Sequence, residues 1–495
     1  MEFKSLKAKL VHFVGIGGVS MSGIAKCFAE NGINVQGSDS ALKDSNYIKG
    51  FESIGIKLFD SHHQDNITKN IDLIVKTSTI KDDNPEIIEA KKLGIKIIER
   101  FEALELILSA FKVKIGISGS SGKTTTTALT WQALYGTLGV KPSCIIGTIL
   151  NEIHSSVYVN NSSEFCVVEA DESDGSFADM NFNVAIITDI DADHLDHKRY
   201  QGNRENLIKH FEEFTFKTLK NGGVVIYNSD CKTTHTLIQS FLPQYNSNIF
   251  SYSGIDKAVN TVPYIKGDCF LNEVKNTQNG LMLSCKGIVS ANDIFIPMIG
   301  KINAFNALPG LILSKILLKN EKKDIFTQFQ GINKRVEVVG NIGNITIIDD
   351  YAHSPKKIKT FIQSFASYCK DINAQFVIIC EPHKYTRVAS LYDEYITCFD
   401  DCNYLIMMEI FGIQGRDAMM DISSERLTSD IKHRWDLTKN NNFYIKSLKF
   451  NKDILNTYTF SFVKEFFNME HKVFYVFLGA GFSSKYAHLL YGSIK

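Results

Sequence analysis

The sequence lacks an excess of either charge, because Lys plus Arg and Asp plus Glu both total 54. This balance gives no reason to expect nucleic acid or an anionic membrane as a partner. A C-x-x-C pair is also absent: the 10 cysteines are scattered, and the closest two are Cys398 and Cys402. We therefore expect reduced, buried thiols in place of a disulfide framework or a zinc site.

Long apolar runs are missing as well. No stretch reaches the roughly eighteen apolar residues of a membrane-spanning helix, so we expect a cytoplasmic protein without a membrane anchor. A chain of 495 residues is too long for one core, which predicts two or three domains.

A glycine is missing from the first turn motif. An apolar strand is expected at Leu10–Val14, followed by GIGG at 15–18 and a helix whose residues Met21, Ile24, Ala25 and Phe28 share one face. A strand at Asn34–Gln36 then leads to Asp39, where an acid would meet a ribose hydroxyl. Because Ser20 replaces the third glycine of G-x-G-x-x-G, both a nucleotide-binding turn and a plain tight turn stay open.

A second glycine is missing at the most informative stretch, Val113–Thr127. The common phosphate loop G-x-x-x-x-G-K-[ST] would need glycine at Ile117, and the chain has the shorter G-x-x-G-K-T at 119–124. A glycine turn between a strand (Val113–Ile117) and a helix directs backbone N–H groups and Lys123 at one point, which suits a polyphosphate. Thr124 follows, where a hydroxyl can hold Mg²⁺. The alternative for Lys123 is a solvated side chain after a turn.

Acidic residues follow two further predicted strands. Phe165–Val168 ends in Glu169, and Val184–Ile187 leads to a loop in which His194 lies among Asp191, Asp193 and Asp196. Because open α/β sheets bind ligands at the carboxyl ends of their strands, these ends are expected to converge with the phosphate loop. Glu169 is then a candidate Mg²⁺ ligand. His194 is a candidate metal ligand or a partner of the acids around it.

The last third of the chain shows the same strand-to-loop arrangement. Ile345–Ile348 ends in DDYAHSP at 349–355, with Ser354 as the expected N-cap, and Phe376–Ile379 ends in EPHKYTR at 381–387. Arg387 is suited to a bidentate contact with the carboxylate of an amino acid, or is a surface arginine near Asp393. Further strands are expected at Ile71–Val75, Val224–Tyr227, Asn403–Met408 and Val473–Leu478, with a small antiparallel piece at about 250–300. Residues 412–470 show no pattern that we can interpret.

Together these motifs resemble the Mur ligase family of ATP-dependent amide-forming enzymes, in order over nearly the whole chain, and its alanine-adding branch most closely. The resemblance rests on HFVGIGGVSMSGIA at 12–25, GSD at 37–39, HH at 62–63, NPE at 84–86, GSSGKTTTT at 119–127, VEADESDGSF at 168–177, DADHLD at 191–196, GKINAFNA at 300–307, KRVE at 334–337, DDYAHSP, EPHKYTR and GAG at 479–481. VEADESD and PHKYTR are the most specific of these. The short phosphate loop of the family also accounts for the glycine missing at 117.

The resemblance implies an α/β fold of three domains: a Rossmann-like UDP-binding domain (1–111), a central P-loop ATPase-type parallel sheet (112–331) and a Rossmann-like amino-acid-binding domain (332–495). It also implies a role for each matching residue.

The UDP-sugar site would include Gly15, Gly17, Gly18, Ser38, Asp39, Thr77 and Ser78. ATP would contact Gly119, Ser120, Ser121, Gly122, Lys123, Thr124, Thr125, Asn303, Asn306 and Asp350. Thr124, Glu169 and His194 would hold Mg²⁺; Lys123, Glu169, His194 and Arg335 would be catalytic; and Tyr351, His353, His383 and Arg387 would line the amino-acid site.

The activity implied is amide formation between the carboxylate of UDP-N-acetylmuramate and L-alanine through an acyl phosphate, by a monomer or homodimer, with closure of the third domain over ATP. Two residues depart from the alanine-adding pattern, since Ser121 and Ser354 stand where that branch carries histidine. Ser354 occurs in the diaminopimelate- or lysine-adding branch, but the Asp-Asn-Pro-Arg of that branch is absent. The alternatives are a recycling ligase that adds a murein tripeptide, a dehydrogenase that uses GIGG, and a nucleotide-binding protein without turnover.

Overall fold

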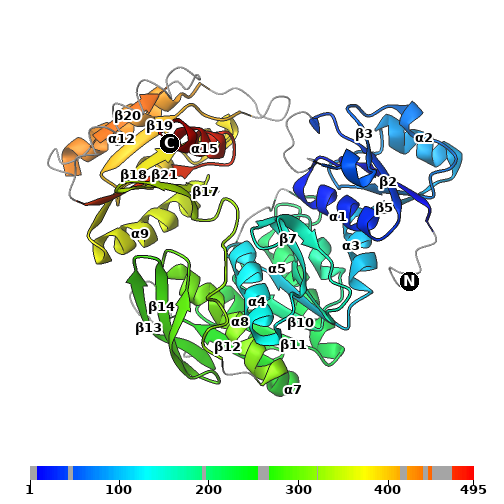
Figure 1. Ribbon diagram of the computed structural model, residues 1–495, viewed down its shortest axis with the longest axis horizontal. Coiled ribbons are helices and arrows are strands. Elements are labelled where there is room, and N and C mark those ends of the chain that lie inside the picture. The colour runs from blue at the N-terminus through cyan, green and yellow to red at the C-terminus, as the bar shows by residue number, and fades with distance from the viewer. Residues whose placement is uncertain are drawn as a thin grey trace. The chain divides into compact units, whose positions relative to one another are not determined.

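The structure is a computed structural model that describes residues 8–42, 48, 50–191, 195, 197–254, 267–319, 322–412, 421–438, 444–448 and 471–494. It contains three mostly parallel sheets with helices on their faces, as the α/β prediction expects (Figure 1). The contacts divide the chain into two compact units. The first (1–273, 283–295 and 305–330) holds the first sheet and most of the second, and the other (274–282, 296–304 and 331–495) holds the third.

The first sheet has five parallel strands in the order β3-β2-β1-β4-β5. The expected strand at Leu10–Val14 is confirmed as β1, and the predicted apolar face of the following helix is buried. The elements are β1 (Leu10–Val14), α1 (Val19–Glu30), β2 (Asn34–Ser38), η3 (Glu52–Ile54), β3 (Lys57–Phe59), η4 (Gln64–Asn66), β4 (Leu73–Lys76), α2 (Pro85–Leu93), β5 (Lys96–Glu99) and α3 (Arg100–Leu108).

The second sheet has ten strands in the order β15-β14-β13-β12-β11-β10-β6-β9-β7-β8, with the phosphate-loop strand β6 between β10 and β9. The strands are β6 (Val113–Ser118), β7 (Ser143–Leu150), β8 (Ser155–Tyr158), β9 (Phe165–Glu169), β10 (Val184–Ile187), β11 (Val224–Asn228), β12 (Ile249–Ser253), β13 (Cys269–Thr277), β14 (Gly280–Gly287) and β15 (Ala291–Ile296). The helices are α4 (Lys123–Leu138), η5 (Ser176–Ala178), α5 (Arg204–Lys220), α6 (Lys232–Gln239), α7 (Leu242–Tyr245), η6 (Asn246–Asn248) and α8 (Ile302–Leu318).

One expectation for this sheet is wrong in part. The small antiparallel piece was expected to begin at about residue 250, but β12 pairs in parallel with β11 and extends the parallel sheet. A two-residue turn at Gln278–Asn279 joins the neighbouring strands β13 and β14, and so short a connection makes this pair antiparallel, within the expected antiparallel piece. Ile249 and Tyr252 of β12 are buried, as expected for a strand inside a sheet.

The third sheet has the order β16-β17-β21-β18-β19-β20, and only its first pair, β16 and β17, is antiparallel among the described strand pairs. The elements are β16 (Glu337–Ile342), β17 (Ile345–Asp350), α9 (Pro355–Asp371), β18 (Ala374–Cys380), α10 (Tyr385–Ser390), α11 (Tyr392–Thr397), β19 (Tyr404–Met408), α12 (Ser424–Thr438), β20 (Tyr444–Leu448), β21 (Lys472–Leu478) and α15 (Ser483–Ile494). Ser354 is the N-cap residue of α9 as predicted, although its side chain makes no capping bond.

All ten cysteines are free thiols and nine of them are buried, as expected. Among the helices in the described ranges, none has the length and hydropathy needed to cross a bilayer.

Candidate active site

The phosphate loop turns sharply between β6 and α4, and two glycines make the turn possible. Gly119 has φ of 141°, and an added Cβ would lie 2.0 Å from the Thr188 hydroxyl oxygen. Gly122 has φ of 79° and is the N-cap residue of α4. Because L side chains rarely adopt such φ values, only glycine fits these positions without strain.

Residues after β10 hold the loop in place. The backbone N–H of Ser121 donates to Asp189 Oδ1 at 2.7 Å, and the Thr188 hydroxyl donates to the Ser121 carbonyl at 2.7 Å. The Ser120 hydroxyl lies 3.1 Å from the Asp191 carbonyl oxygen. The Ser121 side chain itself is exposed. These contacts of Ser121 therefore run through its backbone.

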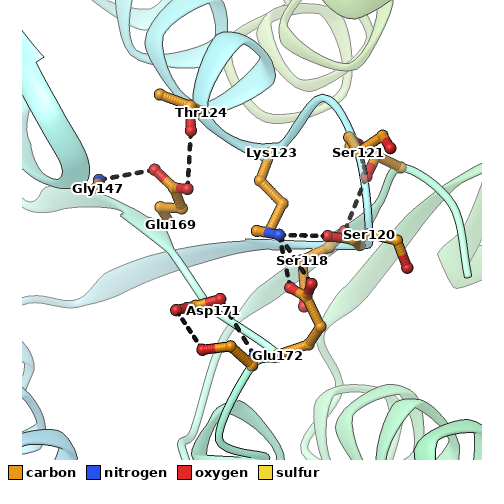
Figure 2. Close-up of polar contacts among 12 residues, drawn as sticks. Ser118, Ser120, Ser121, Lys123, Thr124, Gly147, Glu169, Asp171 and Glu172 are labelled. Atoms are coloured by element: carbon orange, nitrogen blue, oxygen red, sulfur yellow. Dashed lines mark hydrogen bonds and ion pairs between the residues drawn. The ribbon is translucent and has the colours of Figure 1, made fainter. Parts of the chain in front are cut away.

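Lys123 is the first residue of α4, and its amine points back under the loop (Figure 2). It donates to the Gly119 carbonyl at 2.7 Å and lies 2.7 Å from Glu172 Oε2. Burial acts to lower the pKa of Lys123, but the charges of Glu172, Asp171 and Glu169 outweigh burial and raise it. Lys123 is therefore held as a cation at the centre of the site.

Glu172 was not among the residues predicted from the sequence. Its side chain is fully buried, and burial raises its pKa to about 7 against the opposing effect of Lys123. The Tyr200 hydroxyl donates to the Glu172 carbonyl, which fixes the turn after β9 beneath the lysine. The sequence signal was present in VEADESD, but an acidic run alone does not say which carboxylate turns inward.

Thr124 and Glu169 form a second pair beside the lysine (Figure 2). The Thr124 hydroxyl donates to Glu169 Oε1 at 2.8 Å, and the Gly147 N–H donates to Glu169 Oε2 at 2.7 Å. A hydroxyl and a carboxylate are the hard oxygen ligands that Mg²⁺ prefers, so these two residues fit that ion. The expected convergence of the β6 and β9 ends is thus present.

The remaining residues predicted around ATP lie in different places. His194, Asp193 and Asp196 lie outside the described residues. Asn306 lies beside the loop, since a Cβ on Gly122 would come within 3.2 Å of its Oδ1. Asn303 uses its side-chain amide to donate to the Ile299 carbonyl at 2.7 Å. Thr125 is half-buried in the first turn of α4.

The residues predicted for the UDP-sugar gather at the carboxyl ends of β1, β2 and β4. A Cβ added at Gly15 would lie 3.9 Å from Thr77 Cγ2, and the Gly17 N–H donates to Asp39 Oδ2 at 3.0 Å. Gly18 is the N-cap residue of α1. Ser78 is exposed beyond the end of β4. Asp39 is thereby fixed on the glycine loop, at the edge of the sheet where open α/β sheets bind their ligands.

Ser38 differs from the other predicted residues because its hydroxyl faces the interior. It donates to Oε2 of the buried Glu86 at 2.5 Å, and His62 Nδ1 lies 3.0 Å from the same oxygen. Asn66 donates to Glu86 Oε1 at 2.7 Å, and His12 Nε2 lies 3.4 Å from it.

Burial alone would raise the pKa of Glu86, but the bonds from His12 and His62 lower it strongly. Burial opposes protonation of His62, yet its bond to Glu86 raises its pKa.

The four residues predicted for the amino-acid site come together in the second unit. The His353 ring lies 4.8 Å from Tyr351 and 5.4 Å from His383, measured between ring centroids. Arg387 Nη1 donates to His383 Nδ1 at 3.3 Å. Burial lowers the pKa of His353 to about 3, so this imidazole is neutral. Its Nδ1–H donates to the Tyr351 carbonyl at 2.7 Å.

Arg335 lies in a strained turn of this unit. Its neighbours Lys334 and Val336 have φ of 56° and 48°, values that are rare for residues other than glycine and most unusual for a β-branched side chain. The Arg335 guanidinium lies 5.4 Å from the Tyr351 ring centroid. Asp350 is buried and accepts from the N–H groups of Val336 and Ala352 at 2.9 and 2.8 Å. Such strain is retained where surrounding contacts enforce it, often at functional sites.

Comparison with known proteins identifies families whose sequences match this chain. Three domain families match successive parts of the sequence: the Mur ligase family, catalytic domain (residues 10–112), the Mur ligase middle domain (117–314) and the Mur ligase, glutamate ligase domain (334–449).

Individual relatives cover most of the chain. A UDP-N-acetylmuramate–L-alanine ligase of Rickettsia felis is 34% identical over 441 residues, which is 87% of this chain and 88% of that protein. One of Pelobacter propionicus is 32% identical over 427 residues, or 86% and 88%. A solved UDP-N-acetylmuramate-alanine ligase from Thermotoga maritima has the same fold, with a TM-score of 0.74 at 23% identity, covering 99% of this chain and all of that one.

Proposed function

This chain belongs to the Mur ligase family, and from that premise we propose that it joins L-alanine to UDP-N-acetylmuramate at the expense of ATP in peptidoglycan precursor synthesis. One structural observation supports this most directly: the short phosphate loop meets the VEADESD segment, which pairs Lys123 with Glu172 and Thr124 with Glu169. VEADESD is, with PHKYTR, one of the two segments most specific to the alanine-adding branch. The relatives that are 32–34% identical over most of the chain are named UDP-N-acetylmuramate–L-alanine ligase.

The domain assignment that goes with this function is UDP-sugar binding by residues 1–111, ATP binding by 112–331 and amino-acid binding by 332–495. The enzyme would act in the cytoplasm as a monomer or homodimer, with UDP-N-acetylmuramate, L-alanine and ATP as its partners and neither nucleic acid nor membrane among them. The balanced charge of the chain, 54 basic and 54 acidic residues, agrees with small-molecule substrates.

The first chemical step brings two anions together. A carboxylate is a poor acylating agent, so it attacks the γ-phosphorus of ATP; the bond to ADP breaks and an acyl phosphate forms. Lys123 is held as a cation at the loop and offsets the negative charge that accumulates on the phosphoryl oxygens. The backbone N–H groups of the loop and the start of α4 act in the same direction.

Thr124 and Glu169 would hold Mg²⁺, together with the predicted ligand His194. When bound, such an ion neutralises phosphate charge and orients the transferred group. The Thr124 hydroxyl and the Glu169 carboxylate already lie side by side, so oxygen ligands are available without rearrangement of either side chain.

In the second step the amine of L-alanine attacks the carbonyl carbon of the acyl phosphate, and inorganic phosphate leaves. Arg387 supplies a planar donor for the carboxylate of alanine. His353 lies between Tyr351 and His383 and is neutral. Because it carries no positive charge, it does not compete with Arg387 for the carboxylate of alanine.

A substrate panel with detection of released phosphate tests the proposal. Phosphate is expected from ATP only when UDP-N-acetylmuramate and L-alanine are both present, with weaker release for glycine or L-serine. Release with the murein tripeptide alone would assign the chain to the recycling reaction. Release that needs no UDP-sugar would contradict a ligase of this kind altogether.

A further inference from the structure

A cluster of three potential metal ligands lies in the second unit, apart from the residues assigned above. Glu337 begins β16 and Asp349 lies in β17, and the two are direct partners across this antiparallel pair. His488 lies on α15, which packs against both strands. Figure 1 shows α15, in red, beside β17. One ligand atom from each of the three residues lies within 4.8 Å of those of the other two.

Asp349 shows why this cluster is more than a group of surface acids. Its side chain is fully buried, and neither carboxylate oxygen has a hydrogen bond of ordinary geometry among the described residues. Burial raises the pKa of Asp349 to about 7, with Glu337 and Asp350 acting in the same direction and with the Ser484 hydroxyl and Lys334 acting against it. Buried carboxylates in native proteins are normally paired or bound to a metal.

Glu337 adds a second carboxylate with one oxygen committed to the protein. Its Oε2 accepts from the Lys334 N–H at 2.8 Å and from the Asn333 amide at 3.1 Å. Two acids directly opposite each other on neighbouring strands repel when both are ionised. A cation between them would remove the repulsion and satisfy the oxygens of Asp349.

The donor set indicates which cation fits. Mg²⁺ and Ca²⁺ prefer oxygen ligands alone, whereas an imidazole together with carboxylates suits Zn²⁺ and related first-row metals. Three protein ligands leave room for water in a fourth position. His488 is exposed, so an ion can reach the cluster from solvent.

We propose that Glu337, Asp349 and His488 bind one divalent first-row transition metal ion, for which Zn²⁺ is the probe. The ion cross-links the edge pair β16–β17 to the C-terminal helix α15. It also stiffens the backbone next to two predicted site residues. Glu337 lies two residues after Arg335, and Asp349 lies directly before Asp350. Binding of the ion does not require the ligase function proposed above.

The test uses the full-length protein, stripped with EDTA, desalted, and then exposed to a small excess of Zn²⁺. Bound zinc is measured by elemental analysis after gel filtration, and the melting temperature is measured with and without zinc. The wild type is expected to retain about one zinc ion more per chain than the His488→Gln variant, and zinc is expected to raise the melting temperature of the wild type but not that of His488→Gln.

His433→Gln is the matched control, because His433 is an exposed histidine on another helix, α12, of the same unit. It is expected to bind zinc as the wild type does. A Glu337→Gln variant, which keeps an oxygen acceptor for Lys334, is expected to lose the zinc ion as well. Equal zinc retention by the wild type and His488→Gln, or no retained zinc in either, overturns the proposal.

Discussion

Lys123 and Glu172 form a buried ion pair at the phosphate loop, with the amine 2.9 and 2.7 Å from the two carboxylate oxygens. The lysine comes from the start of α4 and the glutamate from the turn after β9. The pair therefore links the loop to the neighbouring strand end. It keeps the lysine charged and limits the directions in which its amine can point.

The first prediction concerns Lys123→Ala. Loss of the cation leaves the phosphoryl charge without its main side-chain partner, so kcat for phosphate release should fall by about 10²–10³-fold. Steady-state kinetics with saturating UDP-N-acetylmuramate and L-alanine measure this. The matched control is Lys112→Ala, an exposed lysine paired with Glu164 just before β6, which should retain full activity. Equal activity of the wild type and Lys123→Ala would show that the lysine takes no part in the reaction.

The second prediction concerns pH. Because burial raises the pKa of Glu172 to about 7, the wild type should lose kcat/KM for ATP as the pH falls from about 8 to about 6 and the carboxylate that orients Lys123 is protonated. Glu172→Gln should have lower activity at about pH 8, by roughly tenfold, and no decline over the same range. A variant that keeps the wild-type pH profile would show that another group titrates.

Some of the site residues could be predicted from the sequence and others could not. Lys123 and Thr124 follow directly from the glycine turn between a strand and a helix, and Glu169 follows from its place at the end of a parallel strand. Those rules are local or topological. Glu172 and Glu86 were missed because each acts through burial against partners far along the chain, such as His12, 74 positions before Glu86 (86 minus 12).

The fold was predictable where apolar runs were strong. The buried strands β1, β6, β9 and β10 were found within a residue of their ends, whereas the short mixed strands β5 (KIIE) and β20 (YIKSL) were missed. Helix α12 was also missed, although its buried Leu427, Ile431 and Trp435 recur every four residues. That spacing was a usable signal within residues 412–470.

The third prediction addresses the Mg²⁺ ligands through Thr124→Val. Valine keeps the shape and removes the hydroxyl next to Glu169, so the Mg²⁺ concentration for half-maximal phosphate release should rise by about tenfold or more. Thr127→Val is a close control, because Thr127 lies in the same helix and its buried hydroxyl has no hydrogen-bond partner in the part of the chain that the structure describes. That variant should show the wild-type Mg²⁺ dependence. Identical curves for both variants would exclude the Thr124 hydroxyl as a ligand.

The fourth prediction addresses Ser121, where the alanine-adding branch usually carries histidine. The contacts of this position use its backbone and the side chain is exposed, so Ser121→His should fold normally and change KM for ATP by less than about threefold. Gly119→Ala, two positions earlier, should instead disrupt the loop, because its Cβ would collide with Thr188. Melting temperatures and ATP titrations measure both. A large loss in Ser121→His would mean that the serine side chain itself contacts the nucleotide.

The fifth prediction concerns the stability of the first sheet and rests on His62 and Glu86. The pKa of His62 is raised in the folded protein by its bond to Glu86, so its contribution to stability is full below its unfolded pKa of about 6.5 and is lost as the pH rises through the folded value. His62→Gln should therefore lower the melting temperature more at about pH 5.5 than at about pH 8.5. The expected loss at the lower pH is about 1–2 kcal/mol of unfolding free energy. His63→Gln, a change at the exposed neighbour, should have little effect at either pH. If His62→Gln destabilises equally at both pH values, the imidazole acts through packing and not through its charge.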